Sequence, residues 1–171
     1  MSNSILFLIF FISLDVSMLL GAYDIGETIS ITDQQVPHNI CYGEYEHDVY
    51  MLGDANYLVN GGNKQITIMK LSAAWWGNFQ HSSLDAMVLE YSDDDRILIV
   101  ENFDEVDQPY SCSQWGAFSE ENIPMIFTDG TPTWDFLLWD MFSLNCSAGT
   151  IVIDHKMRIR HVLDYFPSDD L

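Results

Sequence analysis

The sequence predicts an α/β protein, because two buried-type strands flank a helical segment. Residues 65–73 and 96–100 are continuous runs of β-branched and other apolar residues of strand length, typical of strands covered on both faces. Between them, apolar residues recur at helical spacing, namely Leu84, Met87, Val88 and Tyr91. A strand, a helix and a strand in succession favour a parallel pair joined by a right-handed crossover.

The C-terminal half repeats the alternation of strands and helix. We expect strands at 123–127, 150–154 and 157–162, with an aromatic amphipathic helix at 133–142. Within the last strand, Arg158 and Arg160 alternate with apolar residues, so one face is basic. With Lys156, these two hold half of the basic charge. We expect an exposed strand that pairs with nearby carboxylates, and a ligand site is the alternative.

The chain divides into three parts by composition. Residues 1–22 form a signal peptide or membrane anchor, 23–62 an N-terminal extension of short strands and turns, and 63–171 the main domain. The extension is polar, contains Gly and Asn, and ends at the turn-forming sequence Asn-Gly-Gly-Asn at 60–63.

The N-terminal part predicts export. Residues 5–14 are a compact apolar run, suited to a signal peptide and short for a bilayer span. A longer span would bury Asp15 in the membrane at considerable cost. We therefore expect a secreted or periplasmic protein cleaved near Ala22. An uncleaved anchor holding the domain outside the cytoplasm is the alternative.

The charge balance excludes some partners. With 26 acidic residues against six Lys and Arg, the net charge is −20. Such a chain repels nucleic acids, and anionic membrane surfaces would repel it too. We therefore expect contact with a membrane only through the N-terminal segment, if that segment stays uncleaved. Acidic clusters suggest an extracellular calcium-binding module as one alternative function, although no EF-hand spacing occurs. These clusters are Asp93-Asp94-Asp95 and the group Glu101, Asp104, Glu105 and Asp107.

The chain has three cysteines, Cys41, Cys112 and Cys146. In an exported protein one pair could form a disulfide, and counting alone does not identify the pair. The spacing of His38 and Cys41 is similar to that of metal ligands, but no second ligand pair accompanies it, so we predict no metal site. No nucleotide- or other cofactor-binding motif occurs, and we expect no cofactor.

Three segments, in this order, resemble the thioredoxin-like superfamily, specifically its exported redoxin branch. Residues 63–75 (NKQITIMKLSAAW) resemble the strand that leads into the redox-active turn. Residues 122–129 (NIPMIFTD) are similar to a Pro-containing strand of this branch, and 148–154 (AGTIVID) to the later strand and its antiparallel partner. The chain also resembles the N-terminal domain of selenoprotein P and small redox selenoproteins. The resemblance implies a thioredoxin-like fold with a central mixed β-sheet flanked by helices, and a protein thiol or disulfide as partner.

The same register implies a changed active site. Trp76 stands at the nucleophile position and Phe79 at the resolving position, with Gly77 between them in a degenerate redox turn. Neither aromatic side chain forms a thiolate or a disulfide. Ala148 occupies the position of the family's cis-proline.

Three hypotheses follow for the function. The first is a degenerate domain with a binding or structural role. The second moves the thiol chemistry to Cys112 and Cys146, whose loops are expected near the carboxyl ends of the strands, so that the two could form a disulfide beside the usual site. For these cysteines we favour the alternative of a purely structural disulfide or buried thiols. The third holds that residue 76 is a selenocysteine whose UGA codon was translated as Trp. That residue would make the protein a thiol-disulfide oxidoreductase or thiol peroxidase.

Overall fold

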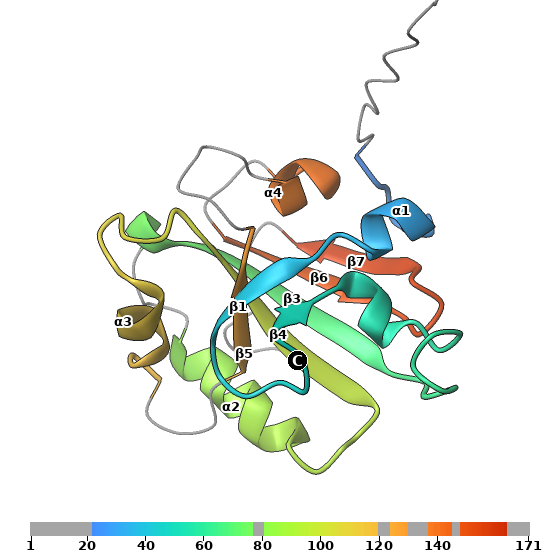
Figure 1. Ribbon diagram of the computed structural model, residues 1–171, viewed down its shortest axis with the longest axis horizontal. Helices are drawn as coiled ribbons and strands as arrows, with labels where there is room; N and C mark the ends of the chain where they lie inside the picture. Colours follow the sequence, from blue (N-terminus) through green and yellow to red (C-terminus); the bar gives the residue numbers. More distant parts are fainter. Residues whose placement is uncertain (1–21, 77–80, 120–123, 130–136, 145–147, 164–171) are drawn as a thin grey trace, which may run out of the picture.

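The computed structural model describes residues 22–76, 81–119, 124–129, 137–144 and 148–163. In this part of the chain, seven strands form one sheet in the order β2-β1-β5-β4-β3-β6-β7 (Figure 1). Their bounds are β1 His38–Tyr42, β2 Val49–Tyr50, β3 Ile66–Ala73, β4 Ile97–Asp104, β5 Met125–Thr128, β6 Ala148–Ile153 and β7 Ile159–Leu163. The helices are α1 Ile31–Gln34, α2 His81–Tyr91, α3 Cys112–Gly116 and α4 Leu137–Met141, with 3-10 turns η1 Leu52–Ala55 and η2 Ala74–Trp76.

The sheet is mixed, as predicted. Strands β3, β4 and β5 are parallel neighbours, while β6 is antiparallel to β3 and β7 to β6. The predicted strand–helix–strand unit is present as β3, α2 and β4. The N-terminal extension contributes β1, which is antiparallel to β5, and β2, which is antiparallel to β1.

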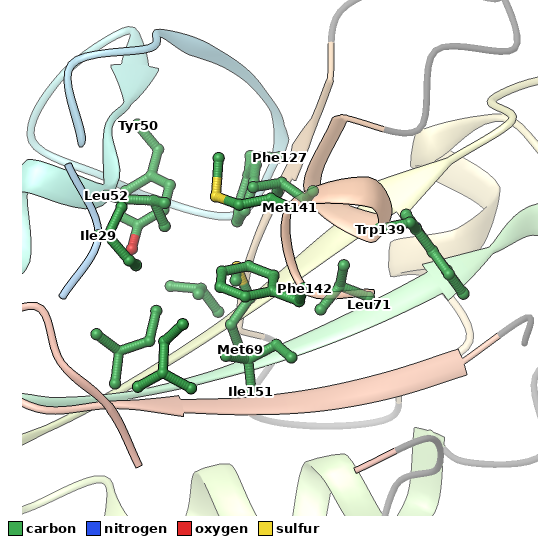
Figure 2. Close-up of a cluster of buried hydrophobic side chains, with 14 of the residues drawn as sticks. Ile29, Tyr50, Leu52, Met69, Leu71, Phe127, Trp139, Met141, Phe142 and Ile151 are labelled. Atoms are coloured by element: carbon green, nitrogen blue, oxygen red, sulfur yellow. The ribbon is translucent and has the colours of Figure 1, made fainter. Parts of the chain in front are cut away.

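The two faces of the sheet bury different clusters. Met69 and Leu71 of β3 point into the larger core, which α4, η1 and the segment around Ile29 cover (Figure 2). The alternate residues of β3 face the other side, where Ile68 packs with Leu84 of α2. This alternation is the period of two expected of a strand covered on both faces.

The helices predicted from the sequence are present in part. The helix expected at 81–91 is α2. Of the helix expected at 133–142, residues 137–141 form α4, and 130–136 lie outside the described residues. No helix in the described ranges is long and apolar enough to cross a membrane.

Candidate functional site

The turn that follows β3 is the first candidate site. Strand β3 ends at Ala73, and the backbone turns at once into η2, where the Trp75 side chain is 55% exposed. Ala148, the first residue of β6, pairs with Ser72 near the carboxyl end of β3. The structure thus brings Ala148 to the strand end from which this turn begins. The Trp76 side chain and residues Gly77 and Phe79 lie outside the described part.

A disulfide lies beside this strand end. Cys41 of β1 bonds to Cys112 of α3, with 6.0 Å between their Cα atoms. This pairing corrects the hypothesis of a Cys112–Cys146 disulfide, and Cys146 itself lies outside the described residues. The sequence does not indicate Cys41 as the partner of Cys112, because Cys41 belongs to the N-terminal extension, which only the antiparallel pairing of β1 with β5 brings into the sheet.

The disulfide is embedded in an apolar cluster that reaches the turn. Cys112 packs with Ala74, Phe103 and Trp115, and the Phe103 and Trp115 rings stack with centroids 4.6 Å apart. Ala74 immediately precedes Trp75 in η2. Cys112 is only 8% exposed, so this sulfur is poorly placed to meet a thiol from solution. The surroundings favour a structural disulfide.

A buried ion pair lies on the same face of the sheet. Lys70 of β3 and Glu101 of β4 are opposite each other in the parallel register, with Nζ and Oε1 3.1 Å apart. The side chains are 3% and 1% exposed. Ser72 Oγ donates a hydrogen bond of 2.7 Å to the same Glu101 oxygen, and Trp115 Nε1 donates one of 3.1 Å. The carboxylate therefore joins β3, β4 and α3 beneath the candidate site.

The position of Glu101 changes the interpretation of the acidic cluster after β4. Glu101 and Asp104 belong to the strand itself, and both are buried, so only part of the group lies in a loop. Nowhere in the described ranges do three His, Cys, Asp or Glu side chains gather in a way that could hold a metal ion. The structure offers no assembled ligand set for the calcium hypothesis there.

His38 belongs to a second buried polar group, on the opposite face. Its Nδ1 lies 3.3 Å from Asp129 Oδ1, and Asn102 Nδ2 donates a 3.0 Å hydrogen bond to the same oxygen. The His38 ring also packs against Phe127. Because the Cys41 sulfur is bonded to Cys112, it has no thiolate to join His38 as a metal ligand.

The basic strand near the C-terminus has the predicted alternation. Met157 and Ile159 are buried, whereas Arg158 and Arg160 are exposed. Arg160 Nε donates a 2.8 Å hydrogen bond to Asp154 Oδ2. Burial raises the pKa of Asp154, but hydrogen bonds from the backbone of Arg158 and Lys156 and from the Arg160 side chain outweigh burial and lower it overall. The expectation that this strand pairs with a carboxylate is confirmed for Arg160.

Comparison with known proteins tests the fold. No protein-family model and no curated protein matches the sequence. Solved structures do match: a protein described as the thiol:disulfide interchange protein DsbE of Chlorobium tepidum superposes with a TM-score of 0.61 at 13% identity, over 86% of this chain and 91% of its own. The chain has the thioredoxin-like fold.

Two further structures agree with this assignment. A cysteine mutant of Xylella fastidiosa PrxQ gives a TM-score of 0.57 at 14% identity, covering 86% of this chain and 90% of its own. A secreted Mycobacterium tuberculosis disulfide oxidoreductase homologous to DsbE of E. coli gives 0.56 at 7% identity, covering 82% and 93%. At identities this low, the superpositions establish the fold alone. The similarity to selenoproteins stays a prediction.

Proposed function

We propose that this protein is an exported thioredoxin-like domain that has lost disulfide exchange at the turn after β3 and works by binding. The observation that carries the proposal is the end of β3. There the chain runs into an aromatic turn with Trp75 exposed, and neither Trp76 nor Phe79 supplies a thiol. Tryptophan is enriched among the residues that contribute most to binding at protein interfaces.

The proposed partner is a protein that bears a thiol or a disulfide. Two observations support it. The fold is shared with a protein described as a thiol:disulfide interchange protein and with a secreted disulfide oxidoreductase, and the aromatic turn begins at the end of β3 where Ser72 pairs with Ala148. A scaffold can keep its binding edge after its chemistry is lost. The apolar run at 5–14 supports export of the domain.

A gain-of-function variant tests the proposal. We expect the full chain to leave insulin disulfides unreduced above the background of dithiothreitol alone. In Trp76→Cys/Phe79→Cys the two thiols would restore exchange at the turn, and insulin reduction should rise clearly above that background. Trp76→Ser/Phe79→Ser is the matched control, because it removes the same aromatic side chains without adding a thiol. Reduction of insulin by the unmodified chain would overturn the proposal.

An active oxidoreductase is the second candidate. It is favoured by the position of residue 76, which lies in η2 three residues past the end of β3, where the resemblance implies a nucleophile. A selenol there would be a strong nucleophile at neutral pH. The nucleotide sequence of codon 76 decides whether a selenol is present: UGA, with selenium in the protein purified from its natural source, supports a selenol oxidoreductase, and UGG excludes it.

If the unmodified chain does show activity with UGG at codon 76, the cysteines are the remaining source. Cys112→Ser would then abolish the activity. A purely structural disulfide predicts that the same substitution changes stability and leaves any activity in place.

A further inference from the structure

The loop that follows β4 lies beside the aromatic turn. The parallel register pairs Ala73, the last residue of β3, with Asp104, the last residue of β4, so the loop and η2 begin at the same end of the sheet. Val106 and Tyr110 of this loop pack against the apolar cluster that contains Ala74 of η2. Figure 1 shows α3, which follows the loop, at this end of the molecule. The loop and the turn therefore form one continuous surface.

This surface carries carboxylates without exposed lysine or arginine. Residues 104–107, which we call the acidic segment, contain Asp104, Glu105 and Asp107. No Lys or Arg occurs in residues 71–95 or 97–155, which include η2, α2, the acidic segment, α3, β5 and α4. The exposed Lys and Arg side chains lie instead before β3 and β4 and from the β6–β7 turn into β7: Lys64, Arg96, Lys156, Arg158 and Arg160. The end of the sheet that holds the aromatic turn is therefore acidic.

Glu105 is a buried carboxyl group without a cation. Its side chain belongs to a residue that is only 8% exposed, and its Oε2 atom has no hydrogen-bond partner within the described residues. Burial raises the pKa of Glu105, the response expected of a carboxyl group that is removed from water without a compensating charge. A buried polar group that lacks a partner is costly to the fold. A cation supplied by another molecule would compensate the carboxylate.

Local contacts fix the shape of the acidic segment. Glu105 and Asp107 have φ angles of 53° and 70°, in the left-handed region that residues other than glycine seldom adopt. Gln108 N donates a hydrogen bond of 3.1 Å to Glu105 O, and Asp107 N donates one of 2.8 Å to Tyr110 O. The Tyr110 ring in turn packs edge-on against Phe118. The carboxylates are thus presented by an ordered loop, which lowers the entropic cost of binding a partner.

We propose that Trp75 and the acidic segment together bind a basic polypeptide segment, in which Lys or Arg accompanies the thiol or disulfide of the partner. This inference rests on the proposed function and adds the charge of the partner to it. An ammonium or guanidinium group would pair with the carboxylates, and the exposed face of an indole also attracts such cations. A net charge of −20 attracts a basic partner and repels an acidic one during encounter.

Three peptides that differ only in charge test the proposal. Each carries the same disulfide-closed loop, flanked by lysine, by glutamine or by glutamate, and binding to the full chain is measured by fluorescence anisotropy of the labelled peptide. We expect the lysine peptide to bind about tenfold more tightly than the glutamine peptide and the glutamate peptide to bind most weakly. The advantage of the lysine peptide should shrink as sodium chloride rises from about 50 mM to about 500 mM, because salt screens the charges.

Two matched variants locate the charge that is recognised. Glu105→Gln/Asp107→Asn removes two carboxylates from the acidic segment and should abolish the preference for the lysine peptide. Asp93→Asn/Asp95→Asn removes the same charge from exposed positions before β4, at the opposite end of that strand, and should keep the preference. Asp107→Asn alone changes only an exposed side chain, so it provides the same test, with a smaller loss, if the double variant does not fold. Trp75→Ala should weaken the binding of every peptide.

Three outcomes would overturn the proposal. Equal binding of the three peptides, weakened alike by Trp75→Ala, would remove the preference for a basic partner and leave the proposed function standing. An equal loss of preference in the Asp93/Asp95 variant and the Glu105/Asp107 variant would show that net charge, and not the acidic segment, attracts the peptide. Failure of all three peptides to bind would overturn both this inference and the binding role on which it rests.

Discussion

The buried Lys70–Glu101 pair makes the sharpest prediction at the scale of single residues. Lys70→Met leaves the Glu101 carboxylate buried beside Ser72 and Trp115 without its cation. Loss of one partner of a buried pair costs about 3–5 kcal/mol of stability. Urea unfolding of the variant should show this loss, and Lys64→Met, which removes an exposed lysine, should unfold like the unmodified chain.

The double variant separates charge from packing. Lys70→Met/Glu101→Gln removes the uncompensated carboxylate and keeps an oxygen that accepts from Ser72 and Trp115. It should therefore be more stable than Lys70→Met alone, because the two sites are coupled. Equal stabilities of the single and double variants would contradict an energetic role for the pair.

The same pair shows which properties of single residues cannot be predicted from the sequence. The alternation of Arg158 and Arg160 with buried neighbours could be predicted, because one strand sets it. From sequence, Glu101 belongs with the acidic residues that follow it, since nothing local shows that Lys70, about 30 positions earlier, lies opposite. A buried charge is defined by its partner, and the parallel register that supplies the partner is a property of the fold.

The Cys41–Cys112 disulfide makes a prediction at the scale of elements. It joins β1 to α3 across a sequence separation of 71 residues. Closing a loop of this length in the unfolded chain is worth about 4 kcal/mol on the chain-entropy model. We expect Cys41→Ser/Cys112→Ser to lose an amount of this order in urea unfolding, and dithiothreitol to lower the stability of the unmodified chain similarly. A reductant that leaves the unfolding midpoint unchanged would contradict this assignment.

The elements that could be predicted are those with a local pattern. β3, β4, β6 and α2 follow from hydrophobic periodicity over their own residues. The short strands β1 and β2 and the helix α3 lack such a pattern and depend on partners distant in sequence. The disulfide likewise needed the pairing of β1 with β5. The turn after β3 is predictable through the resemblance of residues 63–75 to the strand that leads into the family's redox-active turn.

At the scale of the whole molecule, the N-terminal extension is part of one folding unit. Ile29, Tyr50 and Leu52 are almost completely buried in the core that α4 and β3 share (Figure 2). Burial of each such side chain contributes about 1.5–3 kcal/mol, and the extension also supplies one half of the disulfide. Together these terms rival the 5–15 kcal/mol that stabilises an ordinary domain.

Truncation therefore tests whether the change in composition at residues 62–63 is also the boundary of an independently folding domain. A fragment of residues 63–171 lacks β1, β2 and these core side chains, so we expect it to show no cooperative unfolding transition by circular dichroism. The matched fragment 22–171 keeps every described residue and should unfold in a single transition, because it removes only the segment before the sheet. Cooperative unfolding of 63–171 would mean that the main domain is stable alone and that the extension, despite its two strands, is an accessory that could be lost without loss of the fold.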